Sequence, residues 1–220
     1  MTKKQVEEVA ELLAAARSIA DLASANGVLA TKGMGRPRTD HLGAILADAV
    51  LQAGLNYSTV VRPRVERIIR EYPEASDMKE LLNILAIESV PRFLNWTHTV
   101  KSTRFVRLVS CLNENDISNA QSLRTKLADH TLRERLRSID GVGPKTIDYM
   151  GCLVGIDSIA VDRHVRSFAK RAGVLNEEYE YLKAAFSYAA DLLSVPRREL
   201  DAWIWRMYAQ SHDKQLTFSF

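Results

Sequence analysis

The chain has 220 residues, of which 46% are hydrophobic, so it can bury a core as one compact unit or as two small lobes. A formal net charge of +3 makes it mildly basic, which is compatible with a nucleic-acid partner but does not require one. No apolar run approaches the roughly eighteen residues of a membrane span, and the first residues lead into an amphipathic pattern and not an apolar signal core. We therefore expect a cytosolic protein with no membrane partner.

The cysteines also limit the class of protein. Cys111 and Cys152 are isolated thiols, with no CxxC pair and no histidine cluster at zinc-finger spacing. This pattern predicts a reduced chain without a bound metal.

Apolar residues at helical spacing predict a long first helix from Lys3 to about Ala25, ended by Asn26 and Gly27. Its apolar stripe consists of Val6, Val9, Leu12, Leu13, Ala16, Ile19 and Ala20. A glycine- and arginine-rich segment, 31–38, follows without periodicity, and we interpret it as a solvated linker at a lobe boundary. A minor-groove arm is the alternative.

Thr39 is expected to cap a second helix, which ends at Gln52. Ser58 is expected to open a third helix, with its apolar side facing inward and its arginines on a solvated face paired with local glutamates. The inward residues are Val61, Val65, Ile68 and Ile69, and the arginines are Arg62, Arg64, Arg67 and Arg70. Ser76 should begin a short helix that Pro91 terminates.

Further helices are predicted along the rest of the chain, followed by a tail from Leu216. They lie within or near 93–112, 119–128, 132–138, 163–172, 177–193 and 197–210. No stretch alternates with period two, so the sequence predicts an all-α fold.

A glycine turn between two predicted helices is the most informative segment. It reads Gly141-Val142-Gly143-Pro144-Lys145. Glycine supplies the positive φ and open backbone of a tight turn, and proline suits the first position of the following helix. The N–H groups of such a turn, together with the helix dipole, form a seat for one phosphate.

A second motif, Val161-Asp162-Arg163-His164, starts the next predicted helix. Asp162 can be read as its N-cap or as a reactive carboxylate, and both roles can hold together. The amino end of this helix is a candidate for a further phosphate contact beside His164.

The two linked motifs resemble those of the helix-hairpin-helix DNA glycosylases, in particular the endonuclease III and 8-oxoguanine glycosylase branches. The resemblance implies a two-lobed all-α fold, with a helical-barrel domain at 39–153 that ends in the hairpin, a second lobe made of 1–38 and 154–220, and an active cleft between them. The chain departs from the family at Asp140, where relatives usually have proline, and in a leaner loop before Asp162. It also lacks the four C-terminal cysteines that hold an iron–sulfur cluster in many relatives, so we expect no cluster.

What the resemblance implies for chemistry centres on Lys145, whose neutral amine would attack C1′ of a nucleotide, displace a base and leave a Schiff base that permits β-elimination. Asp162 would stabilise the charge that develops on the sugar. The implied function is a glycosylase with lyase activity that excises an oxidised base from double-stranded DNA and nicks the abasic site, acting as a monomer at the nucleoid. No cofactor is implied beyond the monovalent cation that hairpin carbonyls hold in relatives.

The expected DNA-binding residues are Gly141, Val142, Gly143 and His164, with Gln52 as the residue that fills the space of a flipped base and Asn56 as the second candidate for that role. For Gln52 and Asn56, helix capping is an equal alternative. Aromatic side chains could stack on the flipped base or fill the core: Trp96, Tyr149, Trp203 and Trp205.

Two other functions remain open from the sequence. One is a non-enzymatic hairpin module that only binds DNA. The other is a monofunctional glycosylase for alkylated or mismatched bases, which releases the base through water, and lysine at position 145 speaks against it. The sequence does not name the base.

Overall fold

The computed structural model describes residues 2–31 and 38–216, and side chains only as far as Tyr208 at the C-terminal end. Within these residues the regular structure is helical, apart from one isolated bridge between Asp77 and Asn119, which confirms the all-α prediction. The chain divides into two compact units: unit 1 comprises Met1–Arg36 and Asp157–Phe220, and unit 2 comprises Pro37–Ile156. We describe each unit separately.

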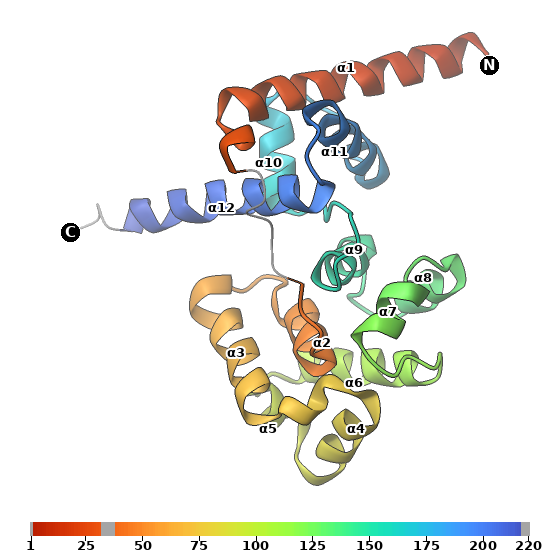
Figure 1. Ribbon diagram of the computed structural model, residues 1–220, viewed down its shortest axis with the longest axis vertical. Coiled ribbons are helices and arrows are strands. Elements are labelled where there is room, and N and C mark those ends of the chain that lie inside the picture. The colour runs from red at the N-terminus through yellow and green to blue at the C-terminus, as the bar shows by residue number, and fades with distance from the viewer. Residues whose placement is uncertain (1, 32–37, 217–220) are drawn as a thin grey trace. The chain divides into compact units, whose positions relative to one another are not determined.

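Unit 1 is formed by helices from both ends of the chain. They are α1 (Lys3–Ala25), the 3-10 turn η1 (Val28–Thr31), α10 (Arg163–Arg171), α11 (Tyr179–Leu193) and α12 (Arg197–Leu216). Helix α1 lies along α11 (Figure 1), where alanines on both helices are buried and allow a close approach. Phe168 packs against Phe186 and, edge-on, against Trp203 in the core of this unit.

The apolar stripe of α1 is buried over only part of its predicted length. Val6, Val9 and Leu13 are 52%, 45% and 49% exposed. The buried cluster of unit 1 takes in α1 from Ala15 onward, with Leu12 packed at its edge. The predicted helix is confirmed at Lys3–Ala25, and its apolar stripe joins the core of unit 1 only in the second half of the helix.

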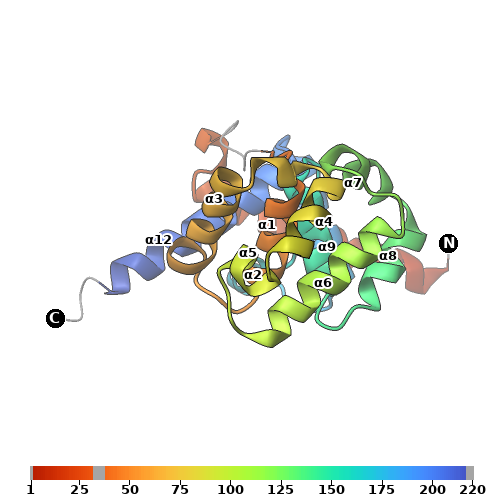
Figure 2. The ribbon, with the colours of Figure 1, turned by 90° about the horizontal axis from the view of Figure 1, so that it is seen from below.

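Unit 2 is built around α2 (Leu42–Leu51), in which every residue is buried. Helices α3 (Arg62–Glu71), α4 (Met78–Ile87), α6 (Thr99–Asn113) and α9 (Pro144–Leu153) surround it (Figures 1 and 2). The remaining elements are the π-helical turn η2 (Tyr57–Val61), the 3-10 turn η3 (Pro73–Ser76), α5 (Val90–Leu94), α7 (Ala120–Lys126) and α8 (His130–Arg137). A central helix enclosed in this way holds its two ends in fixed places.

The start of α2 differs from the prediction, because His41 and not Thr39 is the N-cap. The backbone N–H of Thr39 donates to the carbonyl of Leu153, which leaves Thr39 outside the helix. His41 Nδ1 accepts the N–H of Ala44 at 3.1 Å, and its Nε2 lies 2.9 Å from the carbonyl oxygen of Tyr72. Both ring nitrogens are thus used to fix the first turn.

Ser58 does not open α3 as predicted. Asn56 caps the π-helical turn η2 by accepting the N–H of Thr59, and α3 begins only at Arg62. Pro63 explains the interruption, because it has no N–H to donate to a preceding carbonyl and its ring crowds that carbonyl. Ile69, predicted to face inward, is 42% exposed.

The helix that follows α3 also starts later than predicted. Asp77 and not Ser76 caps α4, by accepting the N–H of Lys79 at 2.8 Å. Pro91 does not end α4, since it lies in the first turn of α5, where a missing N–H is tolerated.

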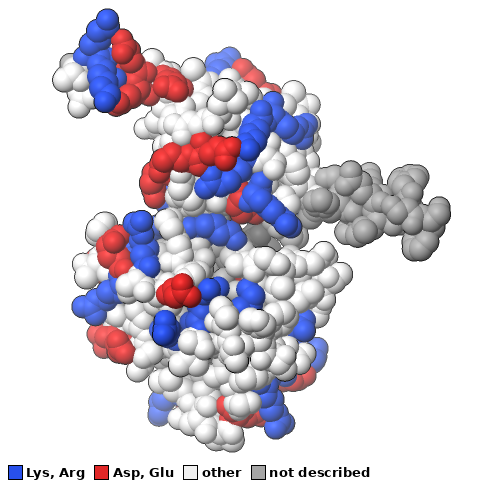
Figure 3. Space-filling model, turned by 180° about the vertical axis from the view of Figure 1, so that it is seen from behind, with Lys and Arg blue, Asp and Glu red and all other residues white. Residues whose placement is uncertain are grey.

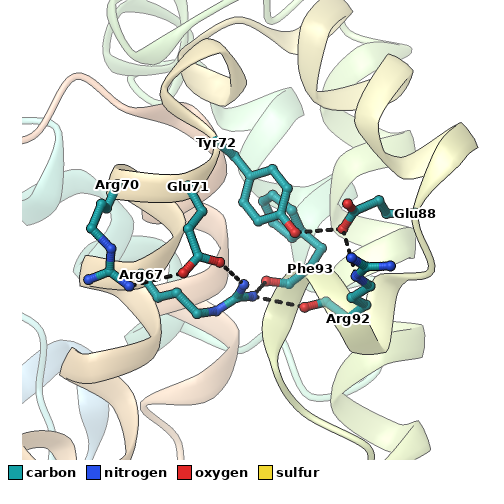
Figure 4. Close-up of polar contacts among 7 residues, drawn as sticks. All are labelled: Arg67, Arg70, Glu71, Tyr72, Glu88, Arg92 and Phe93. Carbon is teal, nitrogen blue, oxygen red and sulfur yellow. Dashed lines mark hydrogen bonds and ion pairs between the residues drawn. The ribbon is translucent and has the colours of Figure 1, made fainter.

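Two of the α3 arginines tie this helix to α5, which overturns the prediction of a solvated face for them. Arg67 donates to the carbonyls of Arg92 and Phe93 and pairs with Glu71, as Figure 4 shows. In the same network the Tyr72 hydroxyl donates to Glu88, which also pairs with Arg92. Arg64 donates to the carbonyls of Val60 and Asn95 and lies over the Trp96 ring.

At the C-terminal end, α12 continues to Leu216, beyond the predicted end near Gln210. Most of the predicted tail, 217–220, and most of the predicted basic linker, 32–37, lie outside the described residues. None of the helices described is long and apolar enough to cross a membrane. Acidic and basic side chains are interspersed over the visible face of each unit (Figure 3).

Candidate functional site

The glycine turn connects α8 to α9 as predicted. Gly141 has φ +75°, the left-handed conformation that glycine adopts without strain. Gly143 is extended, with φ −93°, so the expected positive φ is wrong at this position. Pro144 starts α9, and the buried Asp148 of α9 pairs with Arg133 of α8 at 2.8 Å, which holds the two helices of the hairpin together.

The backbone of the turn is only partly satisfied from within. Val142 is buried, and its N–H donates to the carbonyl of Ile139 at 2.9 Å. Across the described residues, no hydrogen bond is formed by the N–H of Gly141 or of Gly143, and a Cβ atom on Gly143 would meet nothing within 4 Å. The turn therefore has backbone donors and open space at the positive end of α9.

Arg104 of α6 contacts the backbone of the glycine turn. Its Nε donates to the carbonyl of Asp140 at 2.8 Å, and its Nη2 lies 3.9 Å from the Asp140 carboxylate, which is 85% exposed. Asp140, which stands where relatives usually have proline, is thus paired with Arg104, and this pairing reduces its repulsion of a phosphate. The same contact occupies one hairpin carbonyl, while the monovalent cation expected from the resemblance stays a prediction.

Lys145 and Gln52 are brought together by α9 and the end of α2. The Lys145 Nζ donates to Gln52 Oε1 and lies 5.4 Å from the centre of the Tyr149 ring. The Tyr149 hydroxyl in turn donates to the buried carboxylate of Asp48 at 2.9 Å, and Tyr57 donates to its other oxygen at 3.1 Å. Gln52, the residue expected to fill the space of a flipped base, is therefore in direct contact with Lys145, the candidate nucleophile.

Gln52 and Asn56 also have the capping roles that were weighed against DNA contact. Gln52 is the C-cap of α2, and its side-chain nitrogen lies 3.5 Å from the carbonyl of Ala49. Asn56 caps η2 and is exposed. Their contact with DNA stays a prediction.

Lys101 of α6 is a residue that the sequence analysis did not single out. Its ammonium group contacts carbonyl oxygens at the end of α2, and burial, Arg104 and Lys145 together lower its pKa to about 8. Lys101 and Arg104 are three positions apart and share one side of the helix. This spacing could have indicated that the two cations act on one side of α6. The loops that they contact depend on tertiary packing, which the sequence does not show.

Asp162 and His164 belong to unit 1. Asp162 is the N-cap of α10, with one carboxylate oxygen accepting the N–H groups of His164 at 2.8 Å and Val165 at 3.0 Å, which confirms the capping interpretation. The expected phosphate contact beside His164 stays a prediction, although the N–H of His164 itself already donates to Asp162. His164 is only 7% exposed, and its ring stacks on that of Tyr208.

Two of the four aromatic candidates for base stacking are core residues, and the other two, Trp96 and Trp205, are half-buried. Tyr149 and Trp203 are 5% and 7% exposed, as the packing alternative expects. No group of three or more His, Cys, Asp or Glu side chains capable of holding a metal occurs among the residues searched, those that the structure describes. Burial raises the pKa of the half-buried Cys111 thiol, and Cys152 is buried.

The all-helical arrangement and its hairpin define a helix-hairpin-helix glycosylase fold. The structure of the H. pylori 3-methyladenine DNA glycosylase (MagIII) bound to 1,N6-ethenoadenine is similar to this chain, with a TM-score of 0.61 at 18% identity, over 91% of this chain and 98% of that one. The chain belongs to the family described as a domain of unknown function, DUF8548, whose model matches residues 17–209. No curated protein matches the sequence.

Proposed function

We propose that this chain is a DNA glycosylase that removes an alkylated base from duplex DNA through water. The hairpin supplies backbone donors for a phosphate, and the fold is that of a protein described as a 3-methyladenine DNA glycosylase. A base inside a duplex is unreachable, so the damaged nucleotide must be flipped out, and Gln52 stands beside Lys145 as the side chain to take its place.

The observation that carries the choice of water over lysine is the environment of the Lys145 Nζ. It donates to an amide oxygen of Gln52 and lies over the Tyr149 ring, and both partners attract an ammonium ion. An ammonium ion has no lone pair with which to attack C1′. Lys145 is then a cation that binds the DNA backbone, and the proposal takes up the second of the functions left open by the sequence.

Asp162 is the proposed catalytic carboxylate. Its second oxygen is not used in capping α10, since both helix N–H groups donate to Oδ1. As the bond between C1′ and the base nitrogen breaks, a carboxylate stabilises the positive charge on the sugar, and water adds to C1′ and gives up a proton. A purine methylated at a ring nitrogen such as N3 of adenine carries a positive charge, so it leaves as a neutral molecule, whereas a neutral lesion such as 1,N6-ethenoadenine must take up a proton as it leaves.

A lysine-based reaction is the second candidate, and one specific observation favours it. Lys145 contributes to lowering the pKa of Lys101, so the two cations repel each other, and repulsion favours loss of a proton. A neutral Lys145 amine would bond to C1′ as the base departs, form a Schiff base, and permit β-elimination of the 3′ phosphate. The oxidised-base lyase inferred from the sequence is this candidate.

The deciding experiment uses duplexes that each carry one lesion: 1,N6-ethenoadenine, 8-oxoguanine, an oxidised pyrimidine or an abasic site, together with DNA treated with a methylating agent. We expect release of an alkylated base, strand breaks only after hot alkali, and no protein–DNA crosslink with borohydride. Strand nicks without alkali together with a borohydride crosslink, both lost in Lys145→Gln, would show that Lys145 and not water is the nucleophile. Binding without release of any base would leave only a DNA-binding module.

A further inference from the structure

Lys101 makes an unusual set of contacts at the C-terminal end of α2. Its Nζ lies 3.0 Å from the carbonyl oxygen of Val50, 3.3 Å from that of Leu51 and 2.8 Å from that of Ala53. The last carbonyls of a helix have no partner within the helix, and an ammonium ion has three donors. A single side chain from α6 therefore satisfies three acceptors where α2 ends.

These acceptors surround Gln52. The carbonyls of Leu51 and Ala53, on either side of it, both contact Lys101, and its own N–H donates to the carbonyl of Asp48 at 3.0 Å. Its side chain accepts a hydrogen bond from Lys145. The position of Gln52 next to Lys145 thus depends on the backbone on either side of Gln52, which Lys101 holds through hydrogen bonds.

We propose that Lys101 is a positioning residue, which holds the end of α2 so that Gln52 stays in contact with Lys145 beside the hairpin. We call the contacts of Lys101 with the carbonyls of Val50, Leu51 and Ala53 the clamp. Its importance for DNA rests on the proposed function, because only there do Gln52 and Lys145 meet a flipped nucleotide.

The charges around Lys101 make the clamp sensitive to pH. Arg104 acts on it from α6 and Lys145 from α9, while α2 supplies carbonyls and one carboxylate, Asp48, whose oxygens accept the hydroxyls of Tyr57 and Tyr149. Burial is the largest cause of a pKa of about 8, followed by these two cations. Above that pH the amine keeps two donors for three acceptors, and the end of α2 is held less firmly.

Loosening of this end is separable from unfolding. The folded-state pKa lies below the ordinary value of 10.5, so between about 8 and 10.5 the folded chain binds fewer protons than the unfolded one. Stability from this group therefore rises with pH over that range. If the backbone at Gln52 changes as the pH rises through this range, global unfolding does not explain the change, because Lys101 makes the fold more stable over the same range. Such a change is therefore a local effect of the Lys101 contacts.

The clamp is tested without DNA by carbon-detected spectra of the backbone carbonyls of Val50, Leu51 and Ala53 in the full chain. Between pH 6.5 and 9.5 we expect the three signals to shift together with a midpoint of about 8. In Lys101→Met the signals should be displaced at all pH values and show no midpoint, and in Lys101→Arg, which stays charged, they should show none either. Lys79→Met, at an exposed position of α4, is the matched control and should titrate like the parent.

The role in DNA binding is tested with two duplexes of one sequence, one undamaged and one with a stable abasic-site analogue, by fluorescence anisotropy at pH 7. Lys101→Met should reduce the preference for the abasic analogue by about tenfold, as for a lost charged hydrogen bond, while Lys79→Met leaves it unchanged. Melting temperature confirms that both variants are folded.

The outcomes separate the two claims. Carbonyl signals that neither titrate in the parent nor move in Lys101→Met would overturn the clamp. Displaced signals with a full preference for the abasic analogue would reduce Lys101 to a helix cap and overturn its positioning role. If the signals are displaced in Lys101→Met but the parent chain itself shows no preference for the abasic analogue, the clamp is retained and the proposed function is rejected.

Discussion

The guanidinium of Arg104 occupies the space that a side chain on Gly141 would need: an added Cβ would lie 1.8 Å from Nη2. Gly141 also has φ +75°, so glycine is required there by the backbone and by the contact. The missing side chain lets Arg104 reach the carbonyl of Asp140. The shape of the hairpin thus depends on a residue of α6 as well as on its own sequence.

The first prediction concerns Gly141→Ala. Left-handed backbone costs an L-residue about 1–2 kcal/mol, and Arg104 must leave the Asp140 carbonyl. We expect a lower melting temperature and weaker binding to undamaged and lesion duplexes alike, because the affected contacts are to backbone phosphate. Equal affinities for the variant and the parent would show that the hairpin does not bind the phosphate.

Gly143→Val separates binding from folding. The backbone at Gly143 is extended and a Cβ meets nothing, so stability should fall by less than about 1 kcal/mol, the effect of a poorer N-cap. The new side chain stands beside the open N–H groups, and duplex affinity should fall without a change in lesion preference. A folded Gly143→Val chain that binds as tightly as the parent would count against the phosphate seat.

Asp162→Asn tests the carboxylate. Asparagine caps a helix about as well as aspartate, so the melting temperature should stay close to that of the parent. Base release measured in a single turnover should collapse, while duplex affinity survives. Asp162→Ala is the companion variant, expected to lose both release and about 1 kcal/mol of stability. Normal release by Asp162→Asn would leave this residue a structural role only.

The network of Figure 4 leads to a prediction on stability alone. Arg67→Met removes the donor to the carbonyls of Arg92 and Phe93, and we expect unfolding by urea to show a loss of about 1–3 kcal/mol. Arg70→Met, at an exposed position on the same helix, is the control and should change stability by less than about 1 kcal/mol. If the two variants were equally stable, Arg67 would not tie α3 to α5.

The residues that the sequence placed correctly are those whose role is set by near neighbours. Gly141 has a positive φ, Pro144 starts a helix and Asp162 caps one, and these local features can be predicted from adjacent residues, unlike the contact of Arg104 at Gly141. Lys145 and Gln52 were each identified, but their contact joins positions 93 apart in the sequence. Periodicity carries no information about such a contact.

The errors have the same origin. Thr39 is a good capping residue in isolation, yet its backbone bonds to Leu153 and His41 takes the cap. The roles of Lys101 and Arg67 could not be predicted either, because each binds carbonyls, which every residue has. A surface arginine and one that holds another helix look alike in the sequence.

The interleaved composition of the units has a consequence for synthesis. The core of unit 1 joins α1 to α10, α11 and α12, whereas unit 2 is one uninterrupted stretch between them. On the ribosome, unit 2 is synthesised before α10, α11 and α12, the later helices that cover α1, and domains fold as they emerge. The buried side of α1, including Ile19 and Ala23, must then remain uncovered throughout that interval. A nascent chain halted once Ile156 has left the ribosome would carry a folded unit 2 and an α1 available to chaperones and proteases.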